Sequence, residues 1–96
     1  MVHMGGVVFH DLTNAAIEVA QEHPNLTLIG SGVRPVPVLK AIKTLGSTRV
    51  CFGSDTPFSL MHVEVAKYKA LLDGMSEEDK HNVMAGNIIR LLKLDA

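Results

Sequence analysis

The chain has 96 residues, with 9 Lys+Arg against 10 Asp+Glu, which gives a formal net charge of −1 at pH 7. This length allows one small domain or a piece of a larger one, and a hydrophobic fraction of 47% argues against a disordered chain. The balanced charge and the aromatic content of 4% argue against a nucleic-acid partner, and no apolar run approaches the ~20 residues of a membrane span.

The first half of the chain alternates short apolar runs with segments of helical periodicity. Residues 7–9 are apolar, and the next segment, which Pro24 ends, has one apolar helix face formed by Leu12, Ala15, Ala16, Val19 and Ala20. Residues 26–29 are a second apolar run. Pro35 suits the entry to another helix, and Gly46 is expected just past the end of that helix.

The second half repeats this alternation. Residues 49–52 predict another buried strand, and a helix that ends at Gly74 follows, with an expected apolar face of Val63, Ala66, Ala70 and Leu71. Ser76 stands three residues before Asp79, as in a capping box, and predicts a helix start. Asn87 is expected to cap a last helix.

This order of elements predicts an α/β fold. Strands that are apolar on both faces and are separated by helices indicate a parallel sheet with crossover connections. A small open sheet and a slice of a (β/α)8 TIM barrel both fit this order. A complete barrel needs ~250 residues, so residues 1–96 are expected to form a single segment of three consecutive βα units, an incomplete barrel.

Reactive groups of parallel α/β folds lie at the carboxyl ends of the strands. Asp55 follows the apolar run 49–52 and could bind a cation or act as a base, although it could equally cap a turn or the next helix. His3 precedes two glycines and could bind a metal or move a proton, or it could be an exposed terminal histidine.

A third candidate site is the loop Gly30-Ser31-Gly32 with Arg34. The Ser31 hydroxyl and the Arg34 guanidinium could hold a substrate carboxylate, or this stretch could be an ordinary βα loop. The single cysteine, Cys51, is interpreted as strand packing and not as a nucleophile. A lone cysteine and the lack of a signal-peptide pattern fit a reducing, cytoplasmic location.

Four stretches, in order along nearly the whole chain, resemble the amidohydrolase-2 family of metal-dependent TIM-barrel hydrolases and decarboxylases. They are His3-Met4-Gly5-Gly6, the stretch from His23 to Gly32, the stretch from Arg49 to Phe58, and the stretch from Gly86 to Leu92. In the family these stretches belong to strands six, seven and eight and to the closing helix. The resemblance therefore implies the C-terminal part of such a barrel.

The resemblance also implies roles for two residues. Asp55 would be the strand-eight aspartate, which binds the catalytic metal or accepts a proton from metal-bound water. His3 would be the strand-six histidine, which binds metal or acts as an acid or base toward the substrate. The metal implied is divalent, with zinc expected. The family's strand-one H-x-H pair and strand-five histidine are not in this sequence, so weak or absent metal binding by this chain alone is expected.

Three functions are compatible with these features of the sequence. The first is part of a metal-dependent hydrolase that acts on a small carboxylate-bearing or cyclic substrate, inactive in isolation. The second is an inactive module that forms homo-oligomers through exposed barrel edges. The third is a TatD-like nuclease, which is disfavoured because Gly53-Ser54-Asp55 replaces the usual Glu-Thr-Asp and because the chain is not basic.

Overall fold

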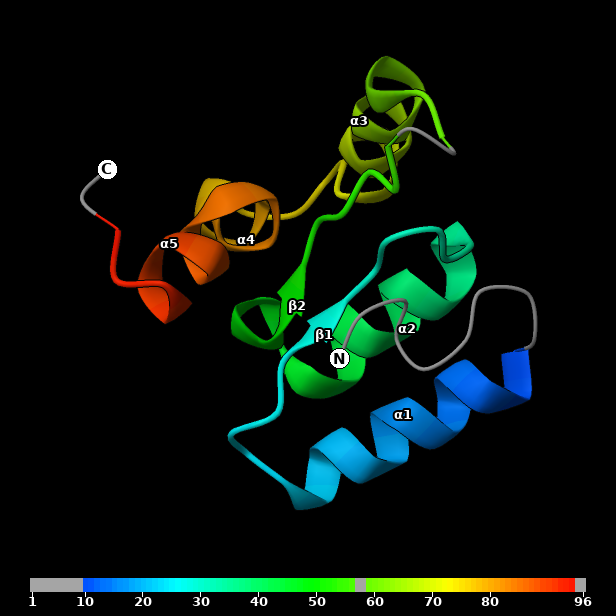
Figure 1. The fold of residues 1–96 in the computed structure, drawn as a ribbon, viewed down its shortest axis with the longest axis vertical. Coiled ribbons are helices and arrows are strands. Elements are labelled where there is room, and N and C mark those ends of the chain that lie inside the picture. Colours follow the sequence, from blue (N-terminus) through cyan, green and yellow to red (C-terminus); the bar gives the residue numbers. More distant parts are fainter. Residues whose placement is uncertain (1–9, 57–58, 95–96) are drawn as a thin grey trace.

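The computed structural model describes residues 10–56 and 59–94. Helices and two short strands alternate along this part of the chain, as expected for an α/β fold (Figure 1). The elements are, in order, α1 (His10–Glu22), β1 (Leu28–Ile29), α2 (Pro35–Leu45), the 3-10 turn η2 (Ser47–Arg49), β2 (Val50–Cys51), α3 (Met61–Leu71), α4 (Glu77–His81), the π-helical turn η3 (Asn82–Gly86) and α5 (Asn87–Leu91).

The two strands pair in parallel, with Leu28 opposite Val50 and Ile29 opposite Cys51. This confirms the predicted parallel pairing, although each strand has only two residues. The described part of the chain contains two strand–helix units, β1–α2 and β2–α3. The expected strand at residues 7–9 lies outside the described residues.

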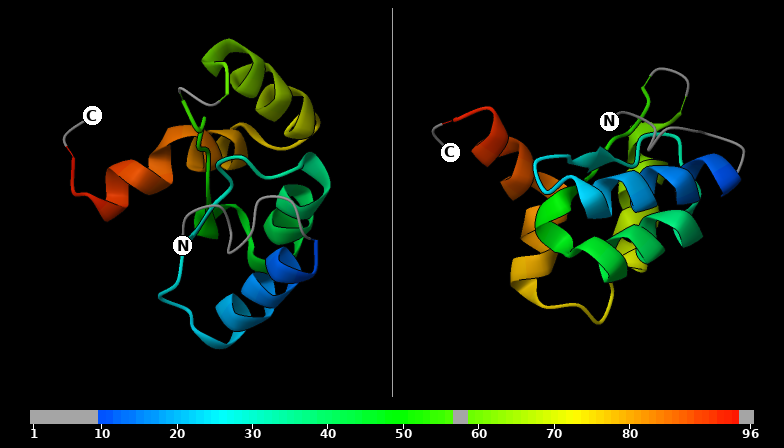
Figure 2. Two further views of the ribbon diagram at one scale, coloured as in Figure 1. Left: turned by 45° about the vertical axis from the view of Figure 1, so that its right-hand side comes forward. Right: turned by 90° about the horizontal axis from the view of Figure 1, so that it is seen from below.

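The hydrophobic core lies between the sheet and α2. The register partners Leu28 and Val50 are fully buried, together with Val38 and Ala41 of α2. Helix α1 lies alongside α2, and α3 and the α4–α5 segment extend from the sheet in different directions (Figures 1 and 2). None of the helices in the described ranges is long and apolar enough to cross a lipid bilayer.

Two of the predicted apolar helix faces are wrong in part. On α1, Thr13, Ile17 and Ala20 are buried, whereas Leu12 and Val19, which were expected to be buried, are about half exposed. On α3 the fully buried side chain is that of Tyr68, and the expected Val63 is 50% exposed. Apolar residues occur around much of each helix, so spacing alone did not identify the side that meets the sheet.

The last helices form one continuous segment, because α4, η3 and α5 follow one another without a break. Asn87 is therefore not a helix cap, which corrects the prediction for that residue. In the π turn the carbonyl of Val83 accepts a hydrogen bond from Phe52 N–H at 2.8 Å. The C-terminal helices are thus tied directly to the chain just after β2.

Arg49 joins the start of β2 to the connection between α1 and β1. Its guanidinium donates hydrogen bonds to the carbonyls of Ala20, His23 and Leu26 at 2.7 to 2.9 Å. Charged donors of this kind satisfy the carbonyls at a helix end. The arginine that precedes the strand therefore has a structural role.

The predicted helix start at Ser76 is confirmed, because the Ser76 hydroxyl oxygen accepts a hydrogen bond from Asp79 N–H at 3.1 Å. We expect Ser76→Ala to lower the free energy of unfolding by ~1 kcal/mol and Ser76→Gly to lower it by only a few tenths. Urea denaturation of the three proteins measures both values. Equal losses for the two variants would contradict a capping role for the hydroxyl.

Candidate functional site

The carboxyl ends of β1 and β2 meet at one edge of the sheet. The strand pairing continues past β1, because Gly30 N–H donates to the carbonyl of Cys51 at 3.0 Å. Beyond it, a Cβ atom added to Gly53 would lie 2.6 Å from the Cβ of Ser31. The loops that follow the two strands are therefore in contact. The structure brings the two predicted strand-end sites, at Ser31 and Asp55, to the same edge.

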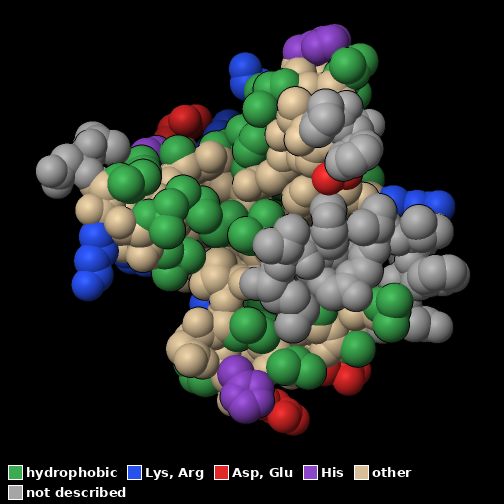
Figure 3. All heavy atoms as spheres, in the orientation of Figure 1, with side chains coloured by type: hydrophobic (Ala, Val, Ile, Leu, Met, Phe, Trp, Pro, Cys, Tyr) green, Lys and Arg blue, Asp and Glu red, His purple; other side chains and the backbone are tan. Residues whose placement is uncertain are grey.

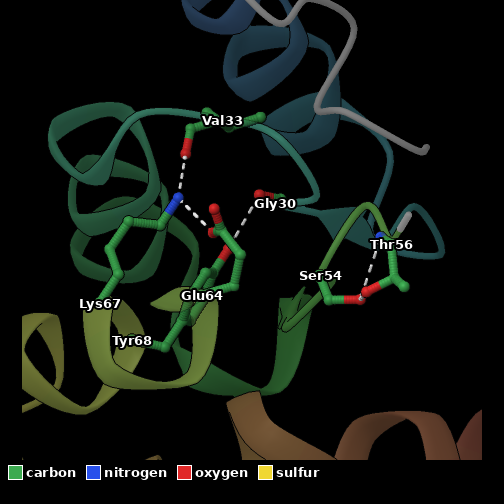
Figure 4. Close-up of polar contacts among 7 residues, drawn as sticks. All are labelled: Gly30, Val33, Ser54, Thr56, Glu64, Lys67 and Tyr68. Atoms are coloured by element: carbon green, nitrogen blue, oxygen red, sulfur yellow. Dashed lines mark hydrogen bonds and ion pairs between the residues drawn. The ribbon is translucent and has the colours of Figure 1, made fainter. Parts of the chain in front are cut away.

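Asp55 lies two residues beyond Gly53 and is half-buried, with φ of 60°. Aspartate tolerates this left-handed conformation better than most residues do. The turn around it is closed by the Ser54 and Thr56 hydroxyls, 2.9 Å apart, and by a hydrogen bond from Thr56 N–H to Ser54 Oγ (Figure 4). Leu60, and not Asp55, occupies the N-cap position of α3. The alternative that Asp55 caps the next helix is therefore wrong.

Ser31 and Arg34 occupy different positions in the loop that follows β1. Ser31 is 8% exposed at the sheet edge, whereas Arg34 is exposed and stands immediately before α2. Pro35 and Pro37 in the first turn of α2 have no backbone N–H groups to donate. An anion held at this helix end would therefore depend on side chains such as that of Arg34, and less on the backbone.

Two side chains of α3 hold this loop in place (Figure 4). Tyr68 Oη donates to the carbonyl of Gly30 at 3.0 Å, and Lys67 Nζ donates to the carbonyl of Val33 at 3.2 Å. Lys67 also forms an ion pair with Glu64 at 2.5 Å. Burial raises the pKa of the Tyr68 phenol, so the hydroxyl stays protonated and remains a donor at neutral pH. These two residues could not be predicted from the sequence, because nothing in their spacing relates them to the loop.

The remaining predictions for titratable side chains concern cysteine and histidine. Cys51 is fully buried, and burial raises the pKa of its thiol, which supports the packing role over that of a nucleophile. His23, His62 and His81 are exposed. His3 lies outside the described residues, so its predicted role as a metal ligand or as an acid or base stays a prediction.

Comparison with known families identifies the family of this chain. Residues 1–94 match the family model described as amidohydrolase. The chain belongs to the amidohydrolase family. This confirms the resemblance found in the sequence. The family is one of hydrolases that generally bind divalent metal ions.

The amidohydrolase chain is also similar to mitochondrial outer membrane protein porin 4 of Arabidopsis thaliana, with 34% identity over 61 residues. That similarity covers 62% of this chain and 22% of the porin, so the chain spans about a fifth of the length of that relative. No solved structure matches the chain.

Several residues of the stretches that resemble this family hold the amidohydrolase fold together. Asn87 is fully buried, and its side-chain amide donates to the carbonyls of Ser47 and Val50 at 2.7 and 2.8 Å. Arg90 donates to Asn87 Oδ1 and to the carbonyl of Thr48. The closing helix of this amidohydrolase is thus attached to the turn that leads into β2, and these polar residues have no part in the strand-end site.

Within residues 10–56 and 59–94, no three His, Cys, Asp or Glu side chains form a group that could hold a metal ion. A zinc ion normally takes three or four protein ligands. The described part of this amidohydrolase offers Asp55 at the strand edge, and that residue alone does not make a metal site.

Proposed function

We propose that the chain forms part of the active site of a metal-dependent hydrolase of the TIM-barrel type, with a small carboxylate-bearing or cyclic substrate. The observation that carries the proposal is the position of Asp55. It lies on a tight turn at the carboxyl end of β2, two residues after Gly53, which contacts the loop of Ser31, in a chain of the amidohydrolase family. That end of the strands is where (β/α)8 enzymes place their catalytic groups.

Asp55 is proposed to accept a proton from the attacking water. A carboxylate can do this when it is fixed within hydrogen-bonding reach of the reacting group. The Ser54–Thr56 turn and the hydrogen bond from Ser59 N–H to the Asp55 carbonyl fix its backbone. Ser31 and Arg34 are proposed to bind the substrate carboxylate, because a hydroxyl and a guanidinium are donors suited to that group.

Zinc is the proposed metal, with Asp55 and His3 as two of its ligands. When bound, a divalent ion lowers the pKa of water and polarises carbonyl groups. Since zinc normally takes three or four protein ligands, these two residues require further ones. Weak zinc binding by this chain alone is therefore part of the proposal. A cytoplasmic location, self-association, and the absence of nucleic-acid or membrane partners stay proposals from the sequence.

We expect Asp55→Asn to weaken zinc binding by at least about tenfold, because the variant keeps the shape of the side chain but loses its charge. Calorimetric titration of the 96-residue chain with zinc, combined with elemental analysis, measures this effect. Asp73→Asn is the matched control, since Asp73 is exposed just after α3, and its affinity should equal that of the starting protein. Equal affinities for all three proteins would contradict a role for Asp55 in metal binding.

A second measurement concerns the reaction. Small lactones and amides that carry a carboxylate are offered with zinc, and Asp55→Asn is expected to lower any hydrolysis rate by ~10²–10⁴-fold. Asp73→Asn should leave the rate unchanged. A rate that survives Asp55→Asn would count against the proposed proton acceptor.

A further inference from the structure

The loop between β1 and α2 is held from α3 at both of its ends. Val33 N–H donates to the carbonyl of Gly30 at 3.1 Å, which closes residues 30–33 into a turn. Tyr68 Oη donates to the Gly30 carbonyl at the start of this turn, and Lys67 Nζ donates to the Val33 carbonyl at its end. Figure 4 shows both side chains pointing from the helix toward the loop, whereas Figure 3 shows the whole surface of one side of the molecule. The position of the turn is therefore fixed by α3 as well as by the sheet.

The Val33 carbonyl belongs to the peptide group that leads into Arg34. The Val33 side chain is fully buried, whereas Arg34 is exposed and occupies the N-cap position of α2. A peptide group is planar, so a hydrogen bond to its carbonyl fixes the orientation of the whole plane. The bond from Lys67 therefore sets the direction in which the Arg34 side chain leaves the loop.

Glu64 holds the Lys67 ammonium against this loop. The two side chains form an ion pair at 2.5 Å, and they are only 12% and 23% exposed, respectively. Residues three apart on a helix lie on the same side of it. A partly buried pair is screened less by salt than an exposed one. The carboxylate therefore restricts the Lys67 side chain to the side of α3 that meets the loop.

The same helix follows the turn of Asp55. Ser59 N–H donates to the Asp55 carbonyl at 3.0 Å, and α3 begins at Met61. Asp55 and Lys67 thus belong to one segment, with the proposed proton acceptor at its start and the support of the Arg34 loop further along. The two parts of the proposed site therefore share one support.

We propose that Lys67 is a positioning residue of the substrate site, which orients the Val33–Arg34 peptide so that the Arg34 guanidinium faces the substrate carboxylate. This inference rests on the proposed function, in which Ser31 and Arg34 bind that carboxylate. Lys67 acts through Arg34 and does not touch the substrate. Removal of the ammonium should then weaken carboxylate binding, and only where Arg34 is present.

The test uses succinate, a small dicarboxylate, titrated into the 96-residue chain without added zinc, so that no metal binds the carboxylate. Backbone amide shifts of residues 31–34 in NMR spectra give the dissociation constant at fixed ionic strength. Lys67→Met is expected to raise it at least about threefold, because the guanidinium loses its orientation. Lys67→Arg keeps a donor and should bind succinate nearly as well as the starting protein. Lys69→Met is the matched control, since Lys69 is exposed on another side of the same helix.

A double-mutant cycle tests whether Lys67 acts through the guanidinium. Arg34→Gln alone should weaken succinate binding, and the addition of Lys67→Met should cause no further loss. Additive losses, or equal effects of Lys67→Met and Lys69→Met, would overturn the positioning role and leave the proposed substrate site standing. An unchanged dissociation constant in Arg34→Gln would contradict the proposed substrate site itself, and the positioning role with it.

A second variant separates positioning from loss of folding. Lys67→Met leaves the largely buried Glu64 carboxylate without its partner, which destabilises a fold. The double variant Glu64→Gln, Lys67→Met removes that charge as well and should show the same loss of succinate affinity. Faster hydrogen exchange of the Val33 amide is expected in both variants, because the turn is released. Circular dichroism checks that each variant is folded, and unchanged succinate affinity in the folded double variant would overturn the proposal.

Discussion

Asn87→Ala is expected to lower the free energy of unfolding by about 3 kcal/mol. The amide of this fully buried side chain is a donor to the carbonyls of Ser47 and Val50. A buried polar group that loses its partner costs ~1–3 kcal/mol, and here two carbonyls are left without this donor. The variant also frees Arg90 from Asn87 Oδ1 and so weakens the contact of the closing helix with the turn before β2. Chemical denaturation followed by circular dichroism measures the loss.

The control for this prediction is Asn14→Ala. Asn14 accepts a hydrogen bond from Lys40 at 2.9 Å on the exposed side of α1. Changes at exposed polar residues usually alter stability by no more than ~0.5 kcal/mol. A loss for Asn87→Ala as small as that for Asn14→Ala would mean that water replaces the buried amide. The attachment of α5 to the chain before β2 would then not depend on Asn87.

Gly30→Ala is expected to destabilise the protein by a similar amount, ~3 kcal/mol, or to prevent folding. A Cβ atom at position 30 would overlap Tyr68 Oη and would lie 3.1 Å from Val38 Cγ2. Gly30 does not have a positive φ, so the cost comes from overlap and not from backbone strain. Insertion of a methyl group into a packed site typically costs ~1–3 kcal/mol. Thermal and urea unfolding of the variant give the value.

A double-mutant cycle separates this overlap from other effects. Tyr68→Phe alone removes the hydrogen bond to the Gly30 carbonyl, and that carbonyl still accepts from Val33 N–H at 3.1 Å. Its cost should therefore be near ~1 kcal/mol. In the Tyr68→Phe background, Gly30→Ala should be at least ~1 kcal/mol less damaging than in the original protein. Additive costs would show that the phenol is not what excludes a side chain at position 30.

The parts of the fold that were predictable depend on local chemistry. Pro35 at the start of α2, Gly46 with φ of 92° at its end, and Ser76 at the start of α4 lie where their backbone preferences indicated. Each of these residues acts within one turn of its own position. The start or end of a helix can therefore be predicted at such residues without knowing which distant segments the helix contacts.

Other features depend on contacts between distant segments, and spacing did not predict them. Arg49 bonds to carbonyls 23 to 29 residues earlier in the chain, and Asn87 bonds to carbonyls 37 and 40 residues earlier. Within one sequence, both residues are as easily interpreted as surface or cap positions. The apolar runs of four residues likewise did not predict that each strand would have only two residues.

For the candidate site, the order of the strands along the chain was informative. Nothing in the sequence indicated which side chains support the loops. The rule that parallel strands end at a common edge holds here, because Gly53, after β2, lies against Ser31, after β1. It gave no indication of Tyr68 and Lys67, which hold the Ser31 loop from a helix more than thirty residues away. His3 is untested by this geometry, because it lies outside the described residues.

The π turn at residues 82–86 has a consequence for insertions and deletions. Its hydrogen bonds join residues five apart, where an α-helix joins residues four apart, so the turn accommodates one residue more than a regular helix does. The carbonyl of Val83 bonds to Phe52 N–H within this turn. A relative shorter by one residue here would close the segment as an α-helix and shift that carbonyl. Loss of one residue between 82 and 86 is therefore expected to break the tie between this segment and the chain just after β2.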